Sequence, residues 1–345
     1  MSEAAVQKDD GPGDDPLDGL KSGSNLERVL AAGHFAVTAE LGPPRGMNVD
    51  LVRKKIGFLD GCVDAANITD NQTGIVRLSS IGTALLVEQA GMETVIQMTC
   101  RDRNRMAIQS DLMGAHVHGI KNVLCLSGDH QSFGDHPGAK NVFDVDSMQL
   151  IRMVQEMRDK GIFQGGEEIK GGGPKLFIGT VASPFSSPVE MRPYRLAKKV
   201  AAGADFCQTQ MIFDMDGFRK YMRKVVDLGL HEKIGILAGF GPLKSPAMAR
   251  FLADNIPGIE VPEAYIRRIE DAGKGIDPED KPALRDAYRA EGIKICIEQI
   301  QEAREIEGIA GVHIMAIEWE AAIKPIVEGA GLTPRPTPGR DADPT

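Results

Sequence analysis

The chain has 345 residues, of which 42% are hydrophobic and 26% are charged, which is an ordinary globular composition. Its formal net charge of -9 argues against a general nucleic-acid or acidic-membrane surface. No apolar stretch approaches the roughly 20 residues of a membrane-spanning helix. The five cysteines include no C-x-x-C pair, which argues against a disulfide framework and a structural zinc site. We therefore expect a cytoplasmic protein without a metal site.

The two ends of the chain differ in composition from the rest. Residues 1–23 are acidic, rich in Gly and Asp, and contain no apolar signal core, so we expect a disordered leader. Residues 332–345 carry repeated prolines and cannot pack well, so we expect a disordered tail. Residues 24–331 then form one folded domain.

Short apolar runs alternate with amphipathic stretches, which is the pattern of a parallel sheet with crossover helices. The predicted strands are 35–40, 63–69, 94–99, 122–127, 175–181, 205–210, 234–239 and 312–317. The predicted helices lie near 49–60, 78–90, 103–117, 146–160, 188–202, 214–228 and 244–255. Eight strands close a barrel, so we expect an α/β fold of the (β/α)8 TIM barrel type. An open, doubly wound sheet is the competing architecture. A mostly helical, charged insertion at 258–307 precedes the last strand.

Six of the apolar runs end in polar or carboxylate residues, as strands of a parallel barrel do at the catalytic face. The runs lead to Glu40, Thr69-Asp70, Gln97, Ser127-Gly128-Asp129, Thr180 and Gln210. This repeated placement predicts that the site lies at the C-terminal ends of the strands.

Glu40 is the strongest candidate for a catalytic acid. It is followed by Leu41-Gly42-Pro43-Pro44, in which the prolines fix φ and hold the carboxylate on a rigid turn. A carboxyl group that leaves an apolar strand should be partly desolvated, which raises its pKa and suits it to donate a proton near neutral pH. The alternative is a structural glutamate paired with Arg45 or a lysine.

Four further polar residues could bind a ligand. Asp129 should point into the mouth of the barrel, unless it only caps its own turn. Gln97 lies inside a short apolar strand and must find hydrogen-bond partners there. Gln208 and Gln210 alternate with Thr209, so both should point to one face, where a glutamine amide can read a flat heterocycle.

Basic residues follow the fifth predicted strand at helical spacing. Arg192 and Arg195 should share a helix face, as should Arg195 and Lys199, with Lys198 beside them. Such a cationic face suits a phosphate or a polyglutamate tail, and a solvated helix face is the alternative. The chain contains neither G-x-G-x-x-G nor G-x-x-x-x-G-K-[ST], so a Rossmann or P-loop site lacks support.

Five motifs together resemble the 5,10-methylenetetrahydrofolate reductase family over residues 25–330. They are Ala39-Glu40-Leu-Gly-Pro-Pro, Asn67-Ile-Thr69-Asp, Gln97-Met-Thr99-Cys100, Leu126-Ser-Gly-Asp129 and Thr209-Gln210-x-x-Phe213-Asp214. The resemblance implies a flavin-dependent barrel that reduces 5,10-methylenetetrahydrofolate to 5-methyltetrahydrofolate. It implies FAD as the cofactor, with FMN as the alternative, and NAD(P)H or an electron-delivering partner subunit as the donor. We also expect an oligomer.

The resemblance also implies roles for individual residues. Glu40 would protonate N10 of the folate, Asp129 would bind the pterin and stabilise the charged intermediate, and Gln210 would bind the pterin or the nicotinamide. The implied flavin contacts are Thr69, Gln97, Gly128, Arg195, Lys198 and Lys199.

The chain departs from the better-known enzymes of that family at several positions. Gln97 stands where they have His, Ser127 where they have Arg, and Arg195 where they have Asn, and no Phe matches theirs near 241–246. The pattern is closer to the branch of acetogenic and related anaerobic bacteria, where a zinc- and iron–sulfur-containing subunit often assists. Two other functions stay open: a pterin-dependent methyltransferase barrel without flavin, and a non-catalytic folate-binding subunit of a reductase complex.

Overall fold

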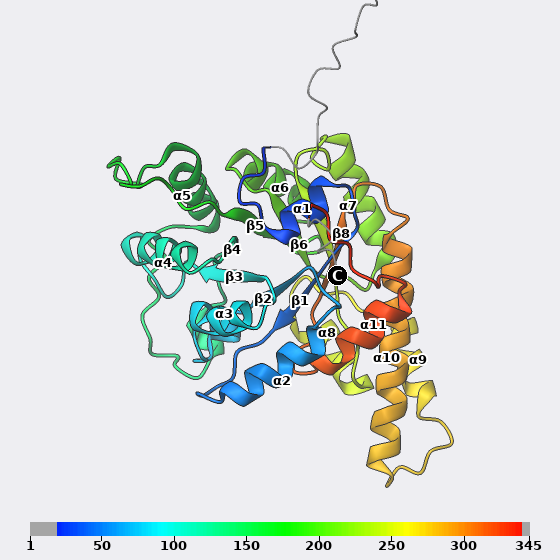
Figure 1. The fold of residues 1–345 in the computed structure, drawn as a ribbon. Helices are drawn as coiled ribbons and strands as arrows, with labels where there is room; N and C mark the ends of the chain where they lie inside the picture. Colours follow the sequence, from blue (N-terminus) through cyan, green and yellow to red (C-terminus); the bar gives the residue numbers. More distant parts are fainter. Residues whose placement is uncertain (1–18, 340–345) are drawn as a thin grey trace, which may run out of the picture.

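The computed structural model describes residues 19–339, in which eight parallel strands form a closed barrel (Figure 1). Each strand pairs with the next one in the chain, and the last pairs with the first. The strands are β1 (Ala36–Leu41), β2 (Ala65–Ile68), β3 (Thr94–Thr99), β4 (Asn122–Leu126), β5 (Phe177–Ala182), β6 (Phe206–Met211), β7 (Gly235–Phe240) and β8 (Gly311–Ile314). The predicted TIM barrel is confirmed, and the open sheet is excluded because β1 and β8 are paired.

Helices surround this barrel, and most begin at a short polar side chain that caps the first turn. The helices after β1 to β4 are α2 (Val49–Leu59), α3 (Ser80–Gln89), α4 (Arg105–Val117) and α5 (Ser147–Lys160). Those after β5 to β8 are α6 (Arg192–Ala201), α7 (Met215–Asp227), α8 (Pro246–Asn255) and α11 (Ile323–Gly329). Asn48, Ser79, Asn104 and Asp146 each accept a hydrogen bond from a backbone N–H two or three residues later, which sets where α2 to α5 begin.

The predicted elements differ from the observed ones mainly near the chain ends. The last strand was predicted to reach residue 317, but its pairing with β1 and β7 ends at Ile314. The chain then turns, with a positive φ of 51° at Glu318, into the short helix η4 (Glu320–Ala322). The helices α1 (Asn25–Ala31) and α11 were not predicted, because seven residues carry too little periodicity to recognise.

The insertion before β8 is helical, as predicted. It consists of α9 (Glu263–Ala272) and α10 (Lys281–Ala303), which lie side by side and extend away from the barrel in Figure 1. Ile266, Ile269 and Ile295 pack in a separate hydrophobic cluster with Phe213, which lies in the loop after β6.

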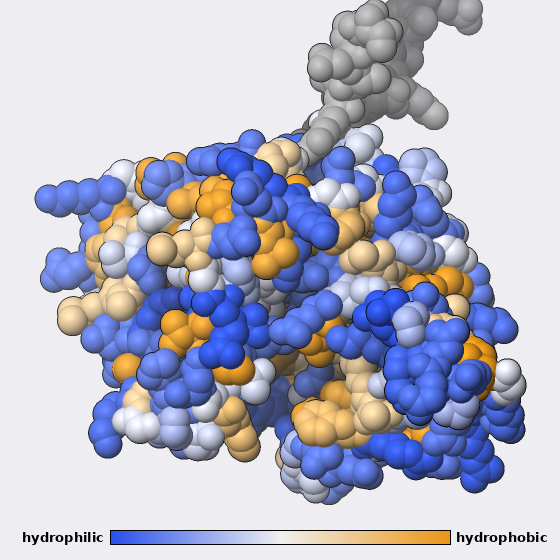
Figure 2. Space-filling view, turned by 90° about the horizontal axis from the view of Figure 1, so that it is seen from below, coloured by the Kyte–Doolittle hydropathy of each residue, from blue (hydrophilic) through white to orange (hydrophobic). Residues whose placement is uncertain are grey.

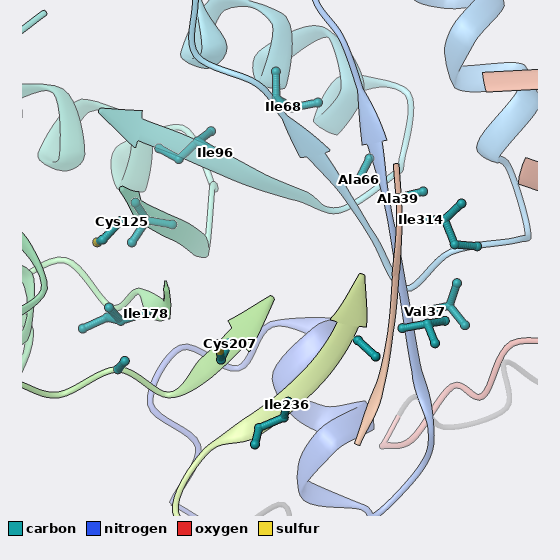
Figure 3. Packing of buried hydrophobic residues seen from close by; sticks show 14 of the residues in the cluster. Val37, Ala39, Ala66, Ile68, Ile96, Cys125, Ile178, Cys207, Ile236 and Ile314 are labelled. Atoms are coloured by element: carbon teal, nitrogen blue, oxygen red, sulfur yellow. The ribbon is translucent and has the colours of Figure 1, made fainter. Parts of the chain in front are cut away.

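Along each strand, side chains point alternately out of the barrel and into it, so the barrel has an outer and an inner hydrophobic core. Outward-facing side chains fill the space between the strands and the helices; Figure 3 labels Val37, Ala39, Ala66, Ile68, Ile96, Cys125, Ile178, Cys207, Ile236 and Ile314. Inward-facing apolar residues fill the N-terminal end of the barrel, where the Phe177 and Phe206 rings stack 5.1 Å apart. Gly179 makes room for this stack, because a Cβ there would lie 2.3 Å from the Phe206 ring. Leu26 and Val29 of α1 join the same cluster and close this end.

Both terminal segments of the described chain bind to this closed end. Lys21 and Ser22 donate backbone hydrogen bonds to Glu27 of α1. Arg335 donates to the Asp64 carboxylate and to the Phe35 carbonyl oxygen. Contacts within the described chain therefore extend past the predicted domain boundaries at residues 24 and 331. The rest of the predicted leader, residues 1–18, and of the predicted tail, residues 340–345, lies outside the described residues. Between residues 19 and 339, no helix combines the length and apolar character needed to cross a membrane.

Candidate active site

The inside of the barrel changes from apolar to polar toward the C-terminal ends of the strands, which we call the mouth. Above the apolar floor lie four buried polar residues on β1, β2, β6 and β8: Thr38, Asn67, Gln208 and His313. Two positions further along their strands come Glu40 and Thr69, with Gln97 and Gln210 near the ends of β3 and β6. The face seen in Figure 2 is hollowed at its centre, with hydrophilic and hydrophobic residues around the hollow.

Glu40 lies one residue before the end of β1, and its side chain is only 15% exposed. It lines a small cavity with Lys55, Arg77 and Glu320. Burial, together with the neighbouring Glu320 carboxylate, raises the pKa of Glu40 to about 7, while a hydrogen bond from the Gln97 side chain opposes the rise. The expected desolvation of this carboxyl group is therefore present.

The cations near Glu40 have other partners. Arg45 pairs with Asp135 at 2.7 Å, so it does not hold Glu40 as the structural alternative required. Lys55 pairs with Glu320 at 2.5 Å and also donates to the Gly42 carbonyl oxygen. Glu40 therefore keeps a carboxyl group that can be protonated or ionised near neutral pH.

A chain of hydrogen bonds lies directly beneath Glu40. Asn67 and Gln208 exchange hydrogen bonds of 2.6 and 3.0 Å through their side-chain amides. Gln208 also donates to Thr38 Oγ1 at 3.0 Å, and Thr38 Oγ1 lies 3.0 Å from His313 Nδ1. The Nε2 atom of His313 lies 4.0 Å from Glu40 Oε1. This network connects four strands across the barrel.

The loop after β4 brings Asp129 to the mouth. Gly128 adopts a positive φ of 86°, and a Cβ there would lie 3.1 Å from carbons of Thr99, so this turn favours glycine. Asp129 is exposed, and its carboxylate accepts a hydrogen bond from the Thr73 backbone N–H at 3.2 Å. The buried Arg101 guanidinium donates to the Asp129 carbonyl oxygen at 2.9 Å and so fixes the loop.

The two polar residues at the end of the second apolar run, Thr69 and Asp70, have different surroundings. Asp70 is buried and accepts hydrogen bonds from Thr99 and Arg103, so it holds neighbouring segments together. The Thr69 hydroxyl is buried and has no hydrogen-bond partner among residues 19–339. Thr180, which ends another predicted run, does not join the mouth, because its register neighbours Cys125 and Cys207 face outward.

The two glutamines of β6 have separate roles. Gln208 is fully engaged in the network under Glu40. Gln210 is partly exposed, and its side-chain oxygen accepts a hydrogen bond from the Met211 N–H at 3.0 Å. The register between β6 and β7 shifts between Gln208 and Met211, so simple alternation does not describe Gln210.

The basic residues of α6 do not form the single cationic face that was predicted. Lys199 is buried, and its ammonium group donates to the Val181 carbonyl oxygen at 2.5 Å. Burial also lowers the pKa of Lys199. Arg195 and Lys198 are exposed, so Arg195 does not share an open face with Lys199. Arg192 donates to the carbonyl oxygens of the preceding loop.

Sequence reasoning missed His313, Thr38 and Glu320. His313 lies between Val312 and Ile314, so the argument that picked out Gln97, a polar residue inside an apolar strand, applied to it equally. Thr38 precedes Glu40 by two residues and therefore faces the same side of β1. Nothing in the local sequence indicates that Glu320 lies close to Glu40.

A family model and several sequence relatives indicate one family. A family model described as methylenetetrahydrofolate reductase matches residues 25–331. A probable methylenetetrahydrofolate reductase (NADPH) of Caenorhabditis elegans is 23% identical over 321 residues, covering 89% of this chain and 44% of that protein. The 5,10-methylenetetrahydrofolate reductase of Pectobacterium carotovorum is 21% identical over 208 residues, covering 60% of this chain and 62% of that protein. The chain thus spans less than half the length of the nematode relative.

A solved structure shares the fold. It is an uncharacterized protein from Clostridium thermocellum that binds two copies of 5-methyl-5,6,7,8-tetrahydrofolic acid, with a TM-score of 0.60 and 15% identity, covering 90% of this chain and all of that one. At that identity the likeness concerns the fold alone. The family model, in contrast, matches nearly the whole described chain. The chain belongs to the methylenetetrahydrofolate reductase family.

Proposed function

We propose that this protein reduces 5,10-methylenetetrahydrofolate to 5-methyltetrahydrofolate with the help of a bound flavin. The observation that carries the proposal is Glu40, a buried carboxyl group at the mouth whose pKa is raised to about 7. An acid with such a pKa is present in both protonation states at neutral pH, as general acid catalysis requires. Family membership supplies the substrate class.

Several residues of the mouth fit a flavin. The buried Thr69 hydroxyl has no partner within the described chain and offers a donor to a ligand. Gly128 is a further proposed contact, because its turn packs against Thr99 and carries the loop that holds Asp129. Arg195 and Lys198 are exposed cations that suit its phosphates. Gln97 is the other proposed contact, whereas the buried Lys199 ammonium is bound to the Val181 carbonyl oxygen and supports the helix. FAD is the proposed flavin, with FMN as the alternative. When bound, the flavin supplies the hydride.

Glu40 and the residues around it have different roles toward the folate. Protonated Glu40 donates its proton to N10, so the five-membered ring opens and leaves an electrophilic iminium. The Gln97 amide, which hydrogen-bonds Glu40, stabilises the carboxylate that remains. Asp129 faces the developing positive charge from the loop after β4, and Gln210 binds the pterin from the end of β6. Asp129→Asn is expected to slow folate turnover for this reason.

The test separates the two halves of the reaction. Glu40→Gln should slow reduction of methylenetetrahydrofolate by ~10²–10⁴-fold, the usual cost of losing a general acid. Reduction of the flavin by NADH, NADPH or an artificial donor should stay nearly unchanged, because no ring opening is involved. Stopped-flow absorbance at the flavin band measures both steps.

The matched control is Glu328→Gln, which removes an exposed carboxylate from α11. It should leave both steps unchanged. If Glu40→Gln slows the two steps equally, Glu40 is structural. A purified protein that holds no flavin and transfers a methyl group from a pterin would replace the proposal with the methyltransferase alternative. The same absorbance traces, recorded with NADH and NADPH in turn, decide whether either nucleotide reduces the flavin directly or a partner subunit is needed.

A further inference from the structure

The hydrogen bonds beneath Glu40 start at an amide pair. Asn67 Nδ2 donates to Gln208 Oε1, and Gln208 Nε2 donates back to Asn67 Oδ1. The second hydrogen of Gln208 Nε2 goes to Thr38 Oγ1 at 3.0 Å. All three side chains are buried, so water does not compete for these bonds.

The hydrogen bonds continue through Thr38 to His313. Since the Thr38 oxygen accepts from Gln208, its single hydrogen must point elsewhere. His313 Nδ1 lies 3.0 Å from this oxygen, whereas the Val312 carbonyl oxygen lies 3.4 Å away. When the hydroxyl donates along the shorter of these two contacts, Nδ1 is the acceptor and the ring hydrogen is on Nε2.

We propose that His313 is a positioning residue for Glu40: the network through Thr38 and Gln208 holds the His313 Nε2–H toward the Glu40 carboxylate and stabilises its ionised form. The proposal rests on the proposed function only in taking Glu40 as the acid. At 4.0 Å the contact is too long for a hydrogen bond, so the N–H acts as an oriented dipole. Burial lowers the pKa of His313 to about 3, so the ring stays neutral and contributes no full charge.

The other charged groups around Glu40 do not take over this role. Glu320 raises the pKa of Glu40, and the Lys55 ammonium is bound to Glu320. Arg77 lines the same cavity, lies 3.6 Å from the exposed Glu318 and donates to the Pro43 carbonyl oxygen. Without the His313 donor, the ionised carboxylate would face Glu320 with the Gln97 amide as its remaining support.

The experiment measures the pKa of Glu40 directly. The protein as purified is labelled with carbon-13 at the glutamate carboxyl carbons, the Glu40 signal is assigned by its loss in Glu40→Gln, and the signal is titrated. His313→Leu should raise the midpoint by about 0.5–1 pH unit, because a donor to the ionised form is lost. His313→Gln keeps an N–H donor near the position of Nε2 and should restore most of the shift.

Two threonine variants test the network separately. Thr38→Val removes the hydroxyl that sets the tautomer, and should raise the midpoint by less than His313→Leu. Thr83→Val is the matched control, since the Thr83 hydroxyl is equally buried but has no partner within residues 19–339. It should leave the Glu40 midpoint unchanged. If His313→Leu does not fold, Thr38→Val should still raise the midpoint, and His313→Gln should leave it close to the wild-type value.

The outcomes also separate this inference from the proposed function. A Glu40 midpoint that stays constant in a folded His313→Leu protein, or in Thr38→Val where His313→Leu does not fold, overturns the positioning role. A raised midpoint in His313→Leu with recovery in His313→Gln supports it. If Glu40→Gln turns over folate normally while His313→Leu shifts the midpoint, the proposed function fails and the positioning of Glu40 stands.

Discussion

Two buried carboxylates at the closed end of the barrel have cationic partners, whereas Glu40 at the mouth has none among residues 19–339. At the closed end, Asp64 is held by Arg335 at 2.6 Å, and Asp205 is held by Arg158 at 2.5 Å. At the mouth, Glu40 is nearly as buried, but the nearest ionisable group in ion-pair range is the neutral ring of His313. Paired charges lock the closed end, whereas the unpaired carboxyl group at the mouth stays ready to exchange a proton.

The largest expected loss of stability comes from breaking an ion pair at the closed end. Arg335→Met should leave the Asp64 carboxylate buried without its cation and cost about 3–5 kcal/mol of unfolding free energy. Urea unfolding at pH 7 measures the loss. Arg267→Met, which removes an exposed pair with Glu263 at 3.5 Å, should cost less than about 1 kcal/mol. Equal losses in the two variants would mean that the closed end gains nothing from its buried pairs.

The next effect comes from the unpaired carboxyl group at the mouth. The folded pKa of Glu40, about 7, lies above its ordinary 4.5, so the folded state holds the proton more tightly than the unfolded chain. Stability should therefore fall as pH rises from about 4.5 to about 7 and then level off. At about 1.4 kcal/mol per pKa unit, the loss is roughly 3 kcal/mol.

This loss is measured as a difference between variants. Glu40→Gln should remove this loss. The unfolding free energy of the variant relative to the wild type should therefore increase between pH 5 and pH 8, as measured by chemical denaturation. Glu328→Gln, which removes an exposed carboxylate, should follow the wild type throughout. A constant difference between wild type and Glu40→Gln across this range would show that Glu40 titrates normally.

A smaller effect is expected at the turn that carries Asp129. Gly128→Ala places a Cβ at a φ of 86°, which costs about 1–2 kcal/mol, and also pushes it against Thr99. Gly119→Ala is the control, because its φ of 91° carries the same backbone cost but a Cβ there meets nothing within 4 Å. Gly128→Ala should lose more stability than Gly119→Ala and should retain less flavin in gel filtration. If the two variants lose the same stability and retain the same flavin, Gly128 is needed only for its backbone conformation.

The smallest effect is expected at the exposed cations of α6. Replacing Arg195 and Lys198 together with Ala should weaken flavin retention several-fold and flatten its decline with salt, since exposed charge contacts are screened. Lys199 should be left intact, because its bond to the Val181 carbonyl oxygen supports the helix. The control replaces the exposed Lys220 and Arg223 of α7. Unchanged retention at all salt concentrations would make the α6 pair a solvated face.

Much of this architecture could be predicted from local patterns. Apolar runs located all eight strands, because a strand buried on both sides must be apolar over most of its length. The end of β8 was placed three residues too late because Met315, Ala316 and Ile317 stay apolar after the pairing stops. The role of Lys199 was also missed, since helical spacing groups residues on a face without showing which face meets the barrel.

The candidate site was predictable to a similar degree. Glu40 was found because a carboxyl group is costly to desolvate, so its position at the end of an apolar strand is informative by itself. The network under it was not found, because it joins Thr38, Asn67, Gln208 and His313, which lie on four strands and up to 275 positions apart. Such contacts exist only after the barrel closes.

The position of Arg335 and Lys21 has a practical consequence for building onto this protein. Both residues bind acids at the closed end, Asp64 and Asp205, so both terminal segments of the described chain arrive on the side away from Glu40. A tag, a surface linker or an additional domain joined beyond either segment would start from that side. The described part of the chain can therefore be attached to a support from that side while the mouth stays uncovered.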